Sequence, residues 1–173
     1  MEFNKKFTDG TDPDFAKLSE EVEQEFYELY GEQQKKYTVY NGLAGIHDVI
    51  LLYTKDIPFA CAGFKVFEGN TVELKRVYVN KEYRGHGYST YIVKQLLDRA
   101  KEKGYEKMIL ETGYKQTAAI ALYKKLGFQT MENYGQYSGD NNSICMGMNL
   151  LDRKQKGAKY GGGREKDDPG SGG

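Results

Sequence analysis

The chain has few of the residues that would indicate disulfide bonds, metal ligation or a strongly charged partner. Its two cysteines, Cys61 and Cys145, both lie in apolar runs, so we expect buried free thiols in a reducing compartment. The two histidines, His47 and His86, are far apart and lack partners at metal-ligand spacing, so we expect no metal site. The 25 basic residues balance 25 acidic ones, which argues against a nucleic-acid-binding surface.

Long apolar runs are also missing. Neither the start, Met1–Lys6, nor any later segment has the composition of a signal peptide or a membrane span. We therefore expect a cytoplasmic protein that does not contact a membrane. The 173 residues are enough for one domain with a proper core and too few for two domains of ordinary size.

The residues that are present alternate between strand and helix patterns. Strands are predicted at Phe3–Thr8, Val49–Thr54, Phe59–Phe67, Thr71–Val79, Lys107–Glu111, Phe128–Met131 and Ser143–Leu150. Helices are predicted from Thr11 to Gly31, over Ser89–Lys103, over Gln116–Leu126 and, as a short one, within Gln33–His47. This order predicts an α/β fold with a mixed sheet and a strand–helix–strand crossover.

Local signals add turns, one irregularity and a domain boundary. A turn is predicted at Asp56-Ile57-Pro58 and a hairpin turn at Glu68-Gly69-Asn70. Within Thr71–Val79 the apolar residues change from one parity to the other, as a β-bulge would produce. From about Arg153 the composition shifts to Gly, Lys, Arg and Asp. We place a single domain at residues 1–151 and interpret 152–173 as a flexible tail or an expression remnant.

The most informative segment is Tyr83–Ser89, which reads YRGHGYS between a predicted strand and a predicted helix. Such a turn points backbone N–H groups outward at the positive end of the helix, which suits a phosphate. Gly85 and Gly87 can adopt φ angles closed to other residues, and Arg84 can add a bidentate contact. An ordinary connection and a different nucleotide-binding turn are the alternatives. The chain lacks a Walker lysine–serine pair and a GxGxxG spacing, which disfavours the second of these.

Three stretches follow one another at a spacing that is typical of one family. They are Val72–Val79, Arg84–Ser89 and Ala119–Phe128, the last of which contains Tyr-x-x-x-Gly-Phe. In these stretches the chain resembles the GNAT superfamily of acyl-CoA-dependent N-acyltransferases. The stretches are similar to its fourth strand, its Q/R-x-x-G-x-G/A pyrophosphate motif and its last helix. Ser89 departs from the glycine or alanine of the motif, but serine is small and keeps its backbone N–H.

The resemblance implies a fold and a ligand. The fold would be a mixed, mostly antiparallel sheet of six to seven strands, flanked by about four helices and splayed between the fourth and fifth strands. Acetyl-CoA would bind in that opening, with no metal. The candidate acetyl-CoA contacts are Val77, Tyr78, Val79, Arg84, Gly85, His86, Gly87, Tyr88, Ser89 and Gln116. The alternative for Gln116 is a polar residue at a helix start.

The resemblance also implies a reaction, in which a primary amine attacks the thioester directly in a ternary complex. Tyr123 would protonate the departing thiolate, although its surroundings also suit a core tyrosine. Glu73, in the fourth strand, would be the general base, and its alternative role is a solvated carboxylate paired with Lys75 or Lys65. Glu111 is a weaker candidate for the base or for a substrate contact.

The acceptor side is expected near the first helix, because Asp9–Glu32 contains nine acids and one lysine. Either this is a solvated face, or Glu25, Glu28 or Glu32 lies at an entrance that attracts a cationic amine. The loop that carries Tyr134, Tyr137 and Asp140 would close the cleft from the other side, although the tyrosines of this Tyr-rich chain can also be ordinary surface residues. A small amine such as an amino acid, polyamine or antibiotic fits, and a protein N-terminus or lysine is an alternative. A catalytically silent acyl-CoA-binding module is a further alternative, and a homodimer is implied by the resemblance alone.

Overall fold

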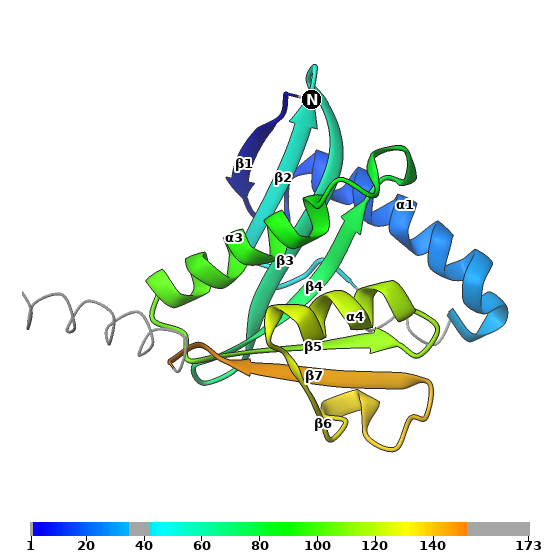
Figure 1. Cartoon of the computed structure of the whole chain (residues 1–173), viewed down its shortest axis with the longest axis vertical. Helices are drawn as coiled ribbons and strands as arrows, with labels where there is room; N and C mark the ends of the chain where they lie inside the picture. Colours follow the sequence, from blue (N-terminus) through cyan, green and yellow to red (C-terminus); the bar gives the residue numbers. More distant parts are fainter. Residues whose placement is uncertain (1, 35–41, 152–173) are drawn as a thin grey trace, which may run out of the picture.

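The computed structural model describes residues 2–34 and 42–151, which form a seven-stranded sheet with helices on both faces (Figure 1). The strands are β1 (Asn4–Thr8), β2 (Asp48–Thr54), β3 (Ile57–Glu68), β4 (Thr71–Val79), β5 (Lys107–Gly113), β6 (Gln129–Met131) and β7 (Ser143–Asn149). The α-helices in these residues are α1 (Pro13–Tyr30), α3 (Tyr88–Glu102) and α4 (Thr117–Leu126). Short 3-10 turns are η1 (Gly31–Gln33), η2 (Lys81–Tyr83) and η3 (Gly135–Tyr137).

The predicted α/β fold is confirmed. The short helix predicted within Gln33–His47 lies largely outside the described residues, and residues 42–47 are not helical. The tail predicted at 152–173 also lies outside them.

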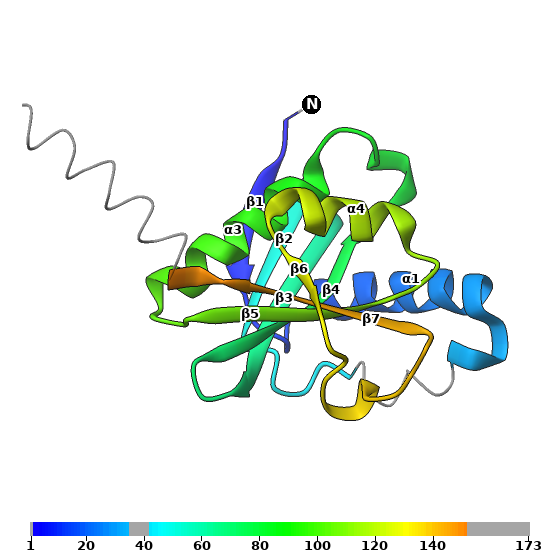
Figure 2. The same cartoon turned by 60° about the horizontal axis from the view of Figure 1, so that its bottom comes forward.

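The sheet separates two apolar cores. Its order is β1-β2-β3-β4-β5-β7-β6, with β4 and β5 parallel and the other neighbours antiparallel. Helices α3 and α4 cover one face and α1 covers the other (Figure 2). Helix α1 buries Phe15, Leu18 and Val22, whose spacing places them on one side of a helix. Ile92 and Leu96 of α3 do the same on the opposite face.

The turn between β2 and β3 differs from the prediction. Lys55 and Asp56 form it, with φ angles of 49° and 64°, and Thr54 pairs with Ile57. Two residues with positive φ make the tight hairpin turn that matches the twist of the flanking strands. The predicted turn at Asp56-Ile57-Pro58 is therefore wrong, because Ile57 and Pro58 already belong to β3.

The predicted bulge in β4 is confirmed at Arg76. Its φ is 58°, and the β3–β4 register shifts between the pairs Cys61–Tyr78 and Gly63–Lys75. Strand β4 therefore has one extra residue opposite β3, and the side chains after the bulge point to the opposite face from the one that the alternation before it would give.

Beyond the bulge, β4 and β5 separate. Their recorded pairing covers Thr71–Leu74 with Lys107–Leu110, yet β4 continues to Val79 and β5 to Gly113. Strand β5 stays paired with β7 up to Gly113, so the sheet remains continuous on that side. The predicted splay is thus confirmed, and the opening lies between residues 75–79 and 111–113.

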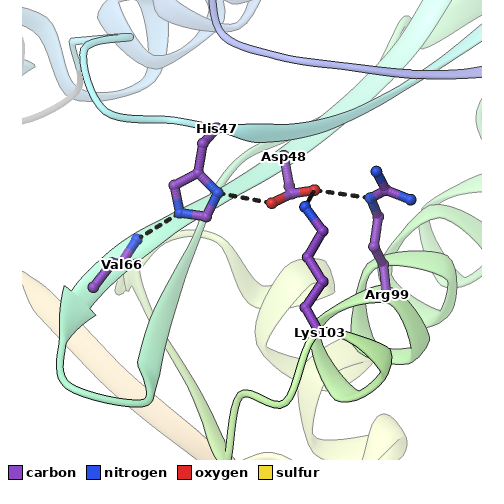
Figure 3. A network of polar contacts seen from close by, with 5 residues as sticks. All are labelled: His47, Asp48, Val66, Arg99 and Lys103. Atoms are coloured by element: carbon purple, nitrogen blue, oxygen red, sulfur yellow. Dashed lines mark hydrogen bonds and ion pairs between the residues drawn. The ribbon is translucent and has the colours of Figure 1, made fainter.

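A buried carboxylate ties α3 to the sheet (Figure 3). Asp48 is 1% exposed and accepts hydrogen bonds from Arg99 Nε at 2.8 Å and Lys103 Nζ at 2.6 Å. Its second oxygen lies 2.7 Å from His47 Nδ1, while His47 Nε2 accepts the backbone N–H of Val66 at 3.1 Å. Burial raises the pKa of Asp48, but the bonds from Lys103, Arg99 and His47 outweigh this and leave it below the ordinary value. The cluster fixes the C-terminal end of α3 and so the direction of the whole helix.

Candidate active site

A cavity of about 770 Å³ lies where β4 and β5 separate. Most of its lining comes from the C-terminal half of α1, the end of β4, the turn into α3, the end of β5 and the start of α4, and Gln34 and Asn142 also line it. Of the predicted site residues, those on its wall are Glu28, Val77, Tyr78, Val79, Arg84, Gly85, Gly87, Tyr88, Ser89, Glu111, Gln116 and Tyr123.

The turn into α3 has the geometry of an anion site. Gly85 and Gly87 have φ angles of 86° and 82°, a region that side chains with a Cβ rarely adopt. Gly87 is the N-cap of α3 and supplies no side chain to cap it. The first N–H groups of a helix have no acceptor within it, so those of Tyr88 and Ser89 remain available beside the cavity. A pyrophosphate fits the turn in charge and in donors.

Arg84 links this turn to α1. Its Nε donates to the carbonyl of Val79 at 2.8 Å, and one terminal nitrogen lies 2.7 Å and 2.9 Å from the two carboxylate oxygens of Glu25. The guanidinium carbon also lies 5.7 Å from the centre of the Tyr78 ring. Arg84 is therefore held at the mouth of the cavity by a carboxylate that a phosphate group could replace.

Glu111 is the acidic side chain on the β5 wall of the cavity. Burial raises its pKa to about 7, although a hydrogen bond from the Ser143 hydroxyl and the charge of Lys75 act in the opposite direction. The Ser143 hydroxyl lies 2.7 Å from Glu111 Oε2. A carboxylate with a pKa near neutrality can accept a proton and release it again under ordinary conditions.

Tyr123 lies on the α4 wall and is 6% exposed. Burial raises the pKa of its hydroxyl, and the charge of Glu111 raises it further. The hydroxyl thus stays protonated near neutral pH and remains a proton donor. The centre of its ring lies 5.7 Å from that of Phe128. Tyr123 therefore packs in the core and also lines the cavity, so both positions considered from the sequence apply to it.

Three predicted site residues are not among the described residues on the cavity wall. Glu73 precedes the bulge, in the paired part of β4, where its carboxylate accepts the Tyr134 hydroxyl at 2.6 Å and lies 3.7 Å from Lys75 Nζ. His86 is exposed at the tip of the turn. Tyr137 is 1% exposed and packs against Cys145 of β7 in a small apolar cluster apart from the two main cores.

The structure adds residues that sequence patterns did not indicate. Tyr30 reaches from the end of α1 to β5, so closely that a Cβ on Gly113 would collide with its hydroxyl. A second, smaller cavity of about 310 Å³ is flanked by Lys94 and Lys125 and shares Thr90 and Leu122 with the first. These contacts join segments far apart in the chain, so no local signal could have revealed them.

The acids of α1 prove to be more than a solvated face. Glu23 forms an ion pair with Arg76 at 2.8 Å, and Glu25 pairs with Arg84. Glu25 and Glu28 both line the cavity. One side of α1 therefore faces the separated end of β4.

Comparison with known sequences identifies the family to which this fold and cavity belong. The sequence profile of the acetyltransferase (GNAT) family matches residues 15–128, which include nearly all of α1, the turn into α3 and all of α4. The chain belongs to the GNAT family. The resemblance noted in the three sequence stretches is thereby confirmed.

Individual relatives of this GNAT chain match over part of its length. The IAA acetyltransferase of Azospirillum brasilense is 35% identical over 79 residues, which are 46% of this chain and 52% of the relative. An uncharacterised N-acetyltransferase of Dictyostelium discoideum is 36% identical over 72 residues, 42% of this chain and 33% of the relative. The matched region thus spans between a third and about half of these curated relatives.

Solved structures share the fold along most of the GNAT chain. A candidate acyl-CoA N-acyltransferase of Klebsiella pneumoniae has a TM-score of 0.71 at 24% identity, covering 86% of this chain and 97% of its own. The PaiA N-acetyltransferase of Thermoplasma acidophilum, solved in complex with coenzyme A, has a TM-score of 0.66 at 15% identity, covering 86% and 99%. At these identities the likeness concerns the fold.

Residues 2–34 and 42–151 contain neither a candidate membrane span nor a cluster of metal-ligating side chains. No helix there is long and apolar enough to cross a bilayer. No group of three or more His, Cys, Asp or Glu side chains in the same residues could hold a metal ion.

Proposed function

We propose that this chain transfers the acetyl group of acetyl-CoA to a primary amine of a small molecule, by direct attack in a ternary complex. One observation carries the proposal: a single cavity combines the α3 N-terminus with Glu111 and Tyr123, two side chains suited to opposite proton transfers. Because β4 is unpaired with β5 after Leu74, the Val77–Val79 backbone can pair with the amides of a pantetheine arm.

Each residue has a defined task in this mechanism. Bound acetyl-CoA supplies the activated acetyl group. Glu111 accepts a proton from the ammonium of the acceptor and so frees the nucleophilic amine. Backbone N–H groups at the separated end of β4 stabilise the negative charge that develops on the thioester oxygen. The Tyr123 hydroxyl donates a proton to the departing thiolate, so that CoA leaves as a thiol.

The position of Glu111 makes it a better candidate base than Glu73. Glu111 lies on the cavity wall, whereas Glu73 binds Tyr134 in the paired part of the sheet. We therefore assign the proton transfer to Glu111 and a supporting role to Glu73. His86 and Tyr137 would then contribute through the shape of the turn and of the loop before β7.

Charge indicates the class of acceptor. The charged side chains among the described residues of the large cavity are Glu25, Glu28, Glu111 and Arg84, and Arg84 is paired with Glu25. Such a wall favours a cationic amine over a molecule that brings a carboxylate of its own. A polyamine or an amine-bearing antibiotic fits this better than an amino acid.

We further propose that the protein acts in the cytoplasm as a homodimer.

A thiol-release assay with acetyl-CoA tests this function across polyamines, aminoglycosides, amino acids and N-terminal peptides. Tyr123→Phe is expected to lower kcat by about 10²-fold or more while the affinity for CoA stays unchanged. Tyr91→Phe is the matched control, because Tyr91 packs on Phe3 and is not among the residues of the cavity wall.

The possible results separate the hypotheses. Preferred turnover of peptides would favour a protein acetyltransferase, and CoA binding without any turnover would favour the silent module. Absence of CoA binding would refute the assignment of the turn into α3.

A further inference from the structure

We propose that Ser143 is a positioning residue that orients the Glu111 carboxylate and keeps it available as a base. This inference rests on the proposed function, because it assigns to Ser143 a role in the proton transfer of Glu111. Ser143 lies at the start of β7 and is not among the described residues of the cavity wall, so it would act through Glu111 alone.

The contact is short and well defined. The Ser143 hydroxyl donates to Glu111 Oε2 at 2.7 Å, the length of a strong O–H···O bond to a carboxylate. Ser143 is 5% exposed, so water does not compete freely for this hydroxyl. Within the described residues, no other side chain is recorded as donating a hydrogen bond to Glu111. One carboxylate oxygen is thus fixed, and the other remains for the cavity.

The backbone holds Ser143 on three sides. It is opposite Gly113 in the β5–β7 ladder, and this pair is the last of the ladder, next to the pair of Thr112 and Ile144. Its N–H donates to the Asp140 carbonyl at 3.1 Å, and its carbonyl accepts from Asn133 Nδ2 at 3.1 Å. Because these backbone bonds do not involve the hydroxyl, a change of the side chain can remove the contact to Glu111 without removing them.

Other groups also face Glu111, and they define what Ser143 contributes. The ionisable side chains that interact with it electrostatically are Lys75 and Glu73 on β4, Asp140 before β7, Tyr30 on α1, Tyr123 on α4, Tyr137 on η3 and Cys145 on β7. Lys75 favours the ionised carboxylate, while Glu73 and Asp140 oppose it. The Ser143 hydroxyl acts differently from these charges, because it favours the ionised form of Glu111 through a hydrogen bond.

The sign of the expected change follows directly. A hydrogen bond to the ionised carboxylate lowers its pKa, so removing the bond raises that pKa. In Ser143→Ala, the titration midpoint of Glu111 should rise by about one pH unit. The rate well below the midpoint should then fall about tenfold, and the rate well above it should change little. A purely structural defect would instead lower the rate by a similar factor at every pH.

The experiment uses the full chain and two readouts. The first is the carboxyl titration of Glu111 by NMR on glutamate-labelled protein, assigned by the signal that Glu111→Gln removes. This readout needs no acceptor. The second is the pH profile of acetyl transfer to the best amine found. Ser138→Ala is the matched control, since Ser138 is exposed on the loop that precedes β7 and its hydroxyl donates to the Asn133 carbonyl.

A second pair of variants covers a folding defect in Ser143→Ala. Ser143→Thr keeps a hydroxyl and Ser143→Val removes it at nearly equal size, so only Val should shift the titration. The inference is overturned if Ala and Val leave the Glu111 midpoint where it is. The proposed base role fails separately, if Glu111→Gln leaves the acid limb of the rate profile in place.

Discussion

The ion pair between Arg84 and Glu25 competes with the ligand that we assign to Arg84. Both oxygens of Glu25 accept hydrogen bonds from one guanidinium nitrogen of Arg84, at 2.7 Å and 2.9 Å. A pyrophosphate in the turn into α3 must displace this carboxylate or bind beside its negative charge. Glu25→Gln removes the charge and keeps a side chain of similar size. We therefore expect Glu25→Gln to bind CoA more tightly than the unaltered chain.

The exposure of the pair limits the size of the effect. The side chains of Arg84 and Glu25 are 48% and 35% exposed, so water and salt screen their attraction. Exposed pairs contribute about 0.2–1 kcal/mol. Because 1.4 kcal/mol corresponds to a factor of ten, the dissociation constant for CoA should fall about 1.4- to 5-fold.

Isothermal titration calorimetry with CoA at low and high salt measures this change. Glu20→Gln is the matched control, since Glu20 is exposed on the same helix and its loss changes the net charge equally. The gain in Glu25→Gln should shrink as salt increases. An unchanged or weaker affinity, or an equal gain in Glu20→Gln, would refute the assignment of Arg84 to the phosphate.

Two further predictions concern the acceptor and the stability of the fold. Cadaverine should be acetylated with a kcat/KM at least about tenfold above that of lysine, because lysine adds a carboxylate to a cavity walled by three others; equal rates in a competition assay would contradict this. Asp48→Asn should lower the free energy of unfolding, measured in urea, by about 2–4 kcal/mol, because it removes the buried negative charge that Arg99, Lys103 and His47 contact. The pKa of Asp48 is lowered in the fold, so its contribution should be complete above the ordinary value of 3.8 and disappear as the pH falls further. Asp56→Asn, at an exposed turn, should cost little, and an equal loss in both variants would count against the cluster.

Much of the fold was predictable because it depends on signals between near neighbours in the chain. The spacing of Phe15, Leu18 and Val22 predicts the buried face of α1. The change of parity within Thr71–Val79 predicts the bulge that the structure has at Arg76. The glycines of Tyr83–Ser89 predict the turn with positive φ, since few other residues adopt that backbone.

Contacts between distant segments were decided only in three dimensions. The sequence offered Glu73 and Glu111 as bases, but where β4 and β5 separate determines which of them reaches the cavity. Arg84, which pairs with Glu25, and the two cationic partners of Asp48 on α3, Arg99 and Lys103, all lie more than 50 residues from these acids, where no periodicity connects them.

The sequence by itself therefore determined the family, the order of the elements and the glycine-containing turn into α3, because each of these follows from local backbone preference and short motifs. The tertiary structure decided which carboxylates line the cavity, which of them titrates near neutral pH and which α1 acid holds Arg84. The physical reason is that burial, charge and hydrogen bonding at a site are sums over neighbours from many elements, and only the packed fold makes them neighbours.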